Sequence, residues 1–132
     1  MSVRSRTGEA TLHLYPAQTT DDIPAVLARS RMIELMELAA ARLMKPNLRD
    51  AESSVSIEMK VTHVASTTVG GTLRAVAAYA GIAGRLHRFR INVFDESGLI
   101  GSAEHTRAVI LERHLLDKTR RRADKATAPS MV

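Results

Sequence analysis

Residues Ala28 to Met44 read ARSRMIELMELAAARLM, and this stretch predicts the one long helix about which the rest of the chain is arranged. Its apolar residues recur at steps of three and four and cover more than one face, which is typical of a deeply packed helix. Ser30 stands where an N-cap is expected for a helix from Arg31 to Met44, and Pro46 ends it.

Two glutamates interrupt the apolar pattern of this helix, and their surroundings differ. Glu34 falls beside Arg31 on the thinner side of the apolar arc. Glu37 lies among Met36, Leu38 and alanines, with no cation three or four residues away. Glu37 is therefore the carboxylate that needs an explanation.

The composition indicates one globular domain. The chain has 132 residues, of which 45% are apolar, 25% are charged and 3% are aromatic. The absence of cysteine excludes disulfides, thiolate metal sites and a cysteine nucleophile. No signal-peptide pattern and no run of roughly 18 apolar residues is present, so we expect a cytoplasmic location.

The net charge of +5 comes mostly from one segment near the C-terminus. Residues 113–125 carry six basic and two acidic side chains, a net of +4. Such a run is usually a solvated tail, and the alternative is an arm that binds a nucleotide, a phosphate or RNA. We predict a flexible N-terminus at 1–8, a domain at 9–116 and a basic, disordered tail at 117–132.

The remaining pattern is that of strands. Glu9–Tyr15 predicts an edge strand that is ended by Pro16 and contains His13. From Glu112 a short helix is expected, with disorder after Arg122. Between the long helix and that point, four strands joined mainly by short turns are predicted: Ser54–Val64, Thr72–Ala80, Arg85–Asp95 and Leu99–Leu111.

Alternation within two of these strands predicts which side chains are buried. In the strand from Ser54, one face holds Val55, Ile57, Met59, Val61 and His63, and the other holds Ser54 and Ser56. In the last strand, His105 and Arg107 share a face with apolar residues.

The element order is strand, helix and then four antiparallel strands. This is the order of the α+β hot-dog fold, in which an antiparallel sheet wraps around one long central helix. A small sheet of this kind leaves a strand edge open, and pairing that edge with a second copy is the usual remedy. A homodimer is therefore expected.

Few residues are candidates for chemistry. The five histidines lie far apart without zinc-site spacing, and no phosphate-binding glycine loop or nucleophile elbow is present. Glu37, His63 and Arg107 remain. A glutamate and a histidine can divide the work of acyl transfer. The alternatives are a satisfied core histidine at His63 and a structural ion pair between Arg107 and Glu37.

Several short motifs resemble the hot-dog thioesterases of the fluoroacetyl-CoA thioesterase type. They are Val26-Leu27-Ala28, Met32-Ile33, Leu35-Met36-Glu37, Val61-Thr62-His63, Ile100-Gly101, His105 and Arg107-Ala108-Val109-Ile110. The resemblance covers roughly residues 10 to 113, and His13-Leu14-Tyr15-Pro16 is also similar. It implies hydrolysis of an acyl-CoA thioester to a free acid and CoA, with no metal and with coenzyme A only as part of the substrate.

The resemblance also implies roles for individual residues. Glu37 corresponds to the catalytic glutamate and acts as nucleophile or as base for water, and His63 is its proton-transfer partner. Arg107 belongs to the same cluster, which in the family lies near the dimer interface. His13 is a candidate for the pocket lining.

Three positions depart from the family pattern. Arg29 stands where the family has an active-site threonine, and Ser30 beside it is the candidate substitute. Ser56 aligns with a glycine, and Ile23 with a phenylalanine that gates the fluoroacetyl-CoA enzyme. Arg29 either narrows the pocket, binds a substrate carboxylate or abolishes turnover.

The favoured function is therefore an acyl-CoA thioesterase for a small or short acyl group. The first alternative is a hot-dog protein that binds acyl-CoA with little or no hydrolysis, and a hydratase or dehydratase of CoA esters is another. A nucleic-acid partner is less favoured because aromatic residues for stacking bases are scarce. The basic tail, Arg85, Arg88 and Arg90 are candidate contacts for CoA phosphates.

Overall fold

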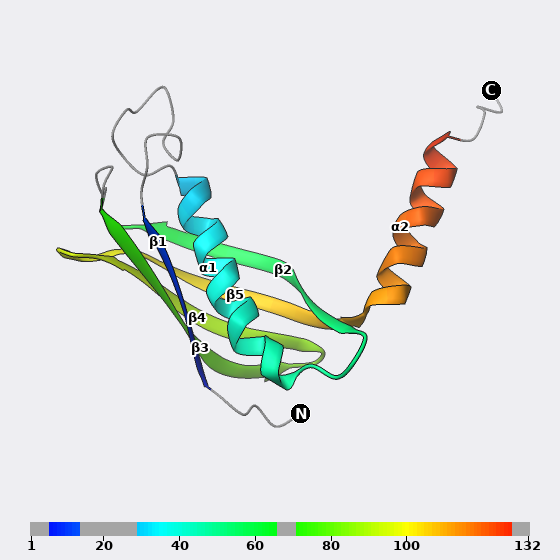
Figure 1. Cartoon of the computed structure of the whole chain (residues 1–132), viewed down its shortest axis with the longest axis horizontal. Helices are drawn as coiled ribbons and strands as arrows, with labels where there is room; N and C mark the ends of the chain where they lie inside the picture. Colours follow the sequence, from blue (N-terminus) through cyan, green and yellow to red (C-terminus); the bar gives the residue numbers. More distant parts are fainter. Residues whose placement is uncertain (1–5, 14–28, 66–70, 128–132) are drawn as a thin grey trace.

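The computed structural model describes residues 6–13, 29–65 and 71–127, and it shows one antiparallel sheet with a helix lying across it (Figure 1). This confirms the predicted α+β hot-dog arrangement. The elements are β1 (Thr7–His13), α1 (Arg29–Met44), the 3₁₀ helix η2 (Lys45–Asn47), β2 (Glu52–His63), β3 (Thr72–Ala83), β4 (Leu86–Asp95), β5 (Gly98–Leu111) and α2 (Glu112–Thr127).

The strand order in the sheet is β1-β3-β4-β5-β2, and every neighbouring pair is antiparallel. β3, β4 and β5 follow one another through short turns, whereas β1 and β2 are brought to the two edges by the chain that includes α1 (Figure 1). The predicted edge position of the first strand is confirmed. β2 forms the other edge, and this matters for the site.

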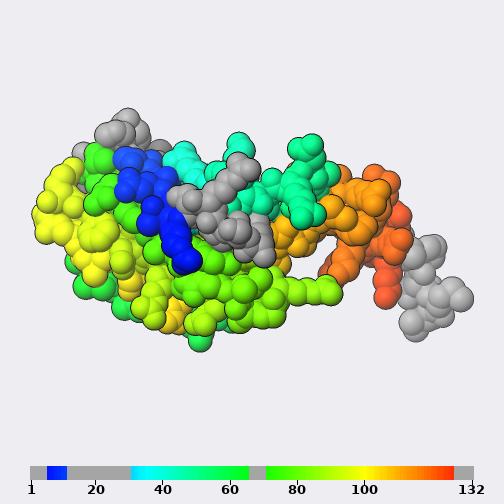
Figure 2. All heavy atoms as spheres, turned by 90° about the horizontal axis from the view of Figure 1, so that it is seen from below, coloured from blue at the N-terminus to red at the C-terminus, as the bar shows by residue number. Residues whose placement is uncertain are grey.

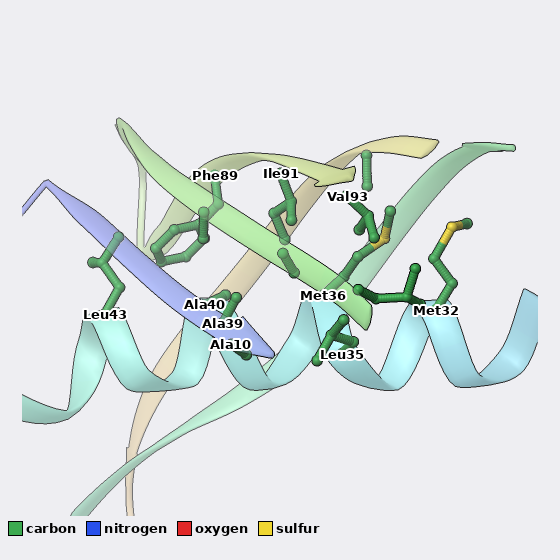
Figure 3. Close-up of a cluster of buried hydrophobic side chains, with 14 of the residues drawn as sticks. Ala10, Met32, Leu35, Met36, Ala39, Ala40, Leu43, Phe89, Ile91 and Val93 are labelled. Carbon is green, nitrogen blue, oxygen red and sulfur yellow. The ribbon is translucent and has the colours of Figure 1, made fainter. Parts of the chain in front are cut away.

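The core lies between α1 and the inner face of the sheet, by which we mean the face toward α1. Met32, Met36 and Leu43 extend from one side of the helix toward the sheet, and Phe89 and Ile91 of β4 belong to the same buried cluster (Figure 3). Each of these five side chains is at most 1% exposed. Burial of one such side chain is worth about 1.5–3 kcal/mol, so this contact holds α1 on the sheet.

The backbones of β1 and α1 approach each other closely at Gly8. A Cβ atom at this position would lie 2.6 Å from the carbonyl oxygen of Ala39 and 2.7 Å from the Cβ of Leu43. Only glycine lets the edge strand lie this close to the helix.

A β-bulge at Ile57 makes the predicted face assignment in β2 wrong. The pairing with β5 shifts between Ser56 and Glu58, so Ile57 is an extra residue and is 53% exposed. Met59, Val61 and His63 do lie on the inner face. The bulge resets the alternation, and Ser54 and Ser56 therefore share that face instead of lying opposite to it.

Other boundaries differ from the prediction. β1 begins at Thr7 and not at Glu9, so residues 7 and 8, predicted to be part of a flexible N-terminus, lie in the sheet. β2 begins at Glu52 and not at Ser54. α1 begins at Arg29, so Ser30 has helical backbone and is not the N-cap. β3 continues to Ala83 through a second bulge at which Gly81 has φ 112°, and the turn follows at Gly84. α2 continues to Thr127, where disorder was expected after Arg122. In the described ranges, no helix has the length and apolar content that crossing a membrane requires.

Candidate functional site

The two glutamates of α1 have different environments, as predicted. Glu34 is exposed and accepts a hydrogen bond from Arg31 Nη1 at 2.6 Å. Glu37 is half-buried on the flank of α1 that faces β2, where its Oε1 atom accepts a long hydrogen bond of 3.4 Å from the Ser56 hydroxyl. Glu37 is therefore oriented by a neutral partner rather than by a cation.

Arg107 lies on the inner face of β5 and is only 6% exposed. Its Nε donates to the Ser54 hydroxyl at 3.0 Å, and its Nη2 donates to the Ser54 carbonyl at 2.9 Å. Arg107 makes no direct ion pair with Glu37 among the described residues. Burial lowers the pKa of the Arg107 guanidinium, and the charge of the Glu37 carboxylate opposes this shift.

His105 holds Arg107 from the other side. Its Nδ1 lies 2.8 Å from the carbonyl oxygen of Glu58, which only accepts hydrogen bonds, so Nδ1 carries the proton. Its Nε2 lies 3.2 Å from Arg107 Nη1, which only donates, so Nε2 is unprotonated. The ring is therefore neutral. Burial is the main cause of its lowered pKa, and the charge on Arg107 adds to it.

These side chains form what we call the Glu37 cluster: Glu37 from α1, Ser54 and Ser56 from β2, and His105 and Arg107 from β5. The sequence pattern identified Glu37 and Arg107. It missed Ser54, because the bulge that turns this residue inward has no clear sequence signal. It also gave no role to His105, although the spacing of two from Arg107 in a strand places both on one face.

His63 lies at the far end of β2, away from Glu37. It pairs with Gly101 of β5, and Gly101 packs against the Met32 side chain near the start of α1. At about 3.3 Å per residue, His63 is roughly 20 Å from Ser56 along the strand. Within one chain the predicted catalytic pair is therefore not brought together. The His63 Nε2 is buried and has no hydrogen-bond partner among the described residues.

The other predicted site residues are placed only in part. Arg29 and Ser30 are in the first turn of α1, at the same end of the helix as His63, and only their backbone is described. His13 ends β1 opposite Thr72. Ile23 lies outside the described residues.

In the part of the chain that the structure describes, no three metal-ligating side chains gather into a metal site. The cluster does combine an oriented carboxylate with a buried cation beside an edge strand. This arrangement suits activation of water, or direct attack, at an electrophilic carbonyl.

Comparison with known proteins gives consistent matches. The family model for the fluoroacetyl-CoA-specific thioesterase matches residues 12–113. The chain is 38% identical over 99 residues to the fluoroacetyl-CoA thioesterase of Streptantibioticus cattleyicolor, an alignment that covers 74% of this chain and 71% of that protein.

Solved structures agree. The crystal structure of the fluoroacetyl-CoA thioesterase FlK superposes with a TM-score of 0.84 at 28% identity, covering 98% of this chain and 100% of that one. A Thermus thermophilus hypothetical protein of the thioesterase superfamily has the same fold, with a TM-score of 0.90 at 22% identity over 97% and 98% of the two chains. These findings confirm the resemblance seen in the sequence, and the chain belongs to the fluoroacetyl-CoA-specific thioesterase family.

Proposed function

We propose that the protein hydrolyses the thioester of a small or short acyl-CoA, with Glu37 as the catalytic carboxylate. The observation that carries the proposal is the half-buried Glu37 carboxylate, which faces Ser56 and is coupled in charge to the buried Arg107. Family membership supplies the reaction class. Because Ile23 stands at the position of the gating phenylalanine, the proposal is not restricted to the fluoroacetyl group.

The chemistry requires one water molecule and no other co-reactant. As a base, Glu37 takes a proton from water while the water oxygen attacks the thioester carbonyl, and collapse of the tetrahedral intermediate expels the CoA thiolate, which then takes up a proton. As a nucleophile, Glu37 forms a mixed anhydride that water then hydrolyses. Both routes need an ionised carboxylate and a proton donor for the leaving sulfur. Coenzyme A enters only as part of the substrate.

His63 is the proposed proton donor, and a second copy of the chain supplies it. β2 is an edge strand of the sheet. Ile57 in β2 is 53% exposed and Val64, which follows the strand, is 58% exposed, so this edge also presents apolar surface. If two β2 strands pair antiparallel about a two-fold axis, each end of one strand lies opposite the other end of its copy. With the axis between Met59 and Lys60, the partner's His63 lies opposite Ser56 and beside Glu37, and the α1 helices of both copies lie on the same face of the joined sheet.

The experiment that tests the function is free-thiol release from a panel of acyl-CoA esters, from acetyl to long-chain and phenylacetyl. Glu37→Gln is expected to lower kcat at least about 100-fold, because the neutral amide neither takes up a proton nor attacks. Glu34→Gln is the matched control on the same helix, since Glu34 is exposed and paired with Arg31, and it should retain wild-type turnover.

Turnover that persists in Glu37→Gln would contradict the assignment of Glu37. Binding of CoA esters without any thiol release would favour the alternative, a protein that binds acyl-CoA without hydrolysing it, because Arg29 occupies the position of the family threonine. The expected cytoplasmic location stays a prediction.

A further inference from the structure

A groove of about 430 Å³ lies between α2 and the outer face of the sheet, the face away from α1. α2 leaves the body of the molecule beyond β5, and a hollow opens between them (Figure 2). The floor of the groove is apolar and consists of Val55 on β2, Ile110 on β5 and Leu115 on α2. Leu115 is 43% exposed, so a large part of its apolar surface faces solvent in the single chain.

The start of α2 is tied to the edge strand β2 as well as to β5. The Glu112 backbone N–H donates to the Ala51 carbonyl at 2.8 Å, and the Ser53 hydroxyl donates to the Glu112 carboxylate at 2.7 Å. From there α2 projects on the side of the sheet where β2 forms the edge (Figure 1). The groove therefore opens toward that edge.

A second exposed apolar side chain, Val64, directly follows β2 at its other end and is 58% exposed. Its backbone N–H donates to the Ile100 carbonyl at 2.8 Å, so its position beside β5 is fixed. Because His63 lies on the inner face, alternation along the strand places Val64 on the outer face. Within one chain, Val64 is roughly 30 Å from Val55 at about 3.3 Å per residue, so it cannot reach the groove of its own chain.

The groove and Val64 meet when two β2 edges pair. In the proposed pairing the partner's His63 lies opposite Ser56, and the two strands run in opposite directions, so the partner's Val64 lies opposite Val55. Residues that lie opposite each other in an antiparallel pair have their side chains on the same face. The partner's Val64 therefore lies beside Val55 on the outer face, at the open side of the groove.

We propose that α2 holds the partner copy, with the partner's Val64 buried between Val55 and Leu115 in the groove. The inference rests on the proposed function, because it takes the shared site that pairing of the β2 edges creates. Burial of apolar side chains that are exposed in the single chain favours this contact, and two-fold symmetry makes it occur twice.

The contact has a consequence for the shared site. Val64 directly follows His63 in the chain, so holding the partner's Val64 also fixes the strand end that carries the proposed proton donor next to Glu37. α2 is therefore a positioning element: it acts through the partner's β2 and touches no reacting atom.

The first experiment is cross-linking, which needs no turnover. The chain has no cysteine, so Val64→Cys/Leu115→Cys carries the only two thiols. A short bismaleimide should convert most of this variant into a covalent dimer, since the two positions of one chain are too far apart to be linked. The matched control is Val64→Cys/Leu116→Cys, because Leu116 is the neighbouring leucine, is 62% exposed and does not line the groove. It should stay mostly monomeric on a denaturing gel.

Two results of the cross-linking would overturn the inference. One is equal cross-linking in the two double variants, or none in either. The other is a covalent dimer of the single variant Leu115→Cys or Val64→Cys, because it would show that identical positions meet across the axis.

The second experiment measures dissociation of the dimer by sedimentation over a range of protein concentrations. Leu115→Ser should raise the dissociation constant roughly tenfold or more, because an apolar contact is lost at two places, and Leu116→Ser should leave it nearly unchanged. Thiol release per chain should then fall on dilution of Leu115→Ser and recover at high protein concentration. A role of Leu115 inside the single chain would instead lower activity equally at every concentration.

These results are separable from the proposed function. Failure to hydrolyse any ester would count against the function alone, because cross-linking and sedimentation use no substrate. A dimer whose dissociation constant is the same in wild type and Leu115→Ser would overturn the inference even if the protein is an active thioesterase.

Discussion

The two ring nitrogens of His105 meet groups of opposite kinds, a carbonyl and a guanidinium, and the contact of Nε2 with the guanidinium requires a neutral ring because Nε2 must accept there. Protonation would place a positive ring against the buried Arg107. His105 is therefore a positioning residue for Arg107, and its charge state should affect the stability of the protein.

We expect the free energy of unfolding to fall as the pH drops below about 6.5, the ordinary histidine pKa. Because the folded state lowers the pKa of His105, the stabilisation from its neutral ring is fully present above that pH and is lost as the pH falls toward the folded-state pKa. His105→Gln keeps an acceptor for Arg107 but does not titrate, so its stability should fall less steeply. Urea unfolding between pH 5 and pH 8 measures the difference.

Some slope should remain in His105→Gln, because burial also lowers the pKa of His87, which pairs with the Tyr79 hydroxyl at 2.8 Å. If the free energy of unfolding falls equally with pH in wild type and in His105→Gln, then the neutral ring of His105 does not position Arg107.

Individual residues were predictable where local spacing determines their environment. Glu37 was separated from Glu34 because a helical cation lies near only one of them. His63 was placed correctly at the end of a buried strand face. Its distance from Glu37 was not predictable, because it depends on which part of β2 lies under each turn of α1, and this is determined by tertiary packing.

The contact between β1 and α1 is predicted to depend on Gly8. Gly8→Ala would place a methyl group 2.6 Å from the Ala39 carbonyl oxygen, and backbone atoms on both sides leave little room to relax. We expect a loss of about 1–3 kcal/mol, which exceeds the roughly 0.4–1 kcal/mol that alanine contributes by restricting the unfolded chain. Equilibrium urea unfolding measures the net change in the free energy of unfolding, in which both effects are combined.

Ala78→Val is the control that tests whether the loss of stability in Gly8→Ala is specific to the contact between β1 and α1. Ala78 is exposed on the outer face of β3, next to β1, and valine suits a strand, so stability should be nearly unchanged. A Gly8→Ala variant as stable as wild type would mean that β1 moves away from α1 at little cost.

The elements and their order were largely predictable because apolar periodicity is a local property. The exceptions are the bulges and α2. A bulge at Ile57 leaves the residue count of the strand apparently regular while it inverts the faces of Ser54 and Ser56. α2 extends past the predicted end at Arg122, because its arginines, lysines and alanines are good helix formers even though its high charge is typical of a disordered tail.

The molecule as a whole raises the question of what covers β2. β1 is covered on its inner face by α1, but the open edge of β2 lies next to the Glu37 cluster and ends at His63. The proposed dimer accounts for both the open edge of β2 and the distance between Glu37 and His63. Pairing two β2 edges joins the two sheets and brings Glu37 of one copy next to His63 of the other. The sequence predicted the open edge but not which residues meet there.

Mixing two inactive variants tests this shared site. Glu37→Gln and His63→Ala should each be inactive alone. In a dimer with one chain of each kind, the intact Glu37 of one chain meets the intact His63 of the other, so one of the two sites is complete. Random exchange makes half of the dimers mixed, and we expect about a quarter of wild-type activity to return. If differently tagged chains co-purify as mixed dimers and activity still does not return, then Glu37 of one chain and His63 of the other do not act in one site, and the proposed shared site is wrong.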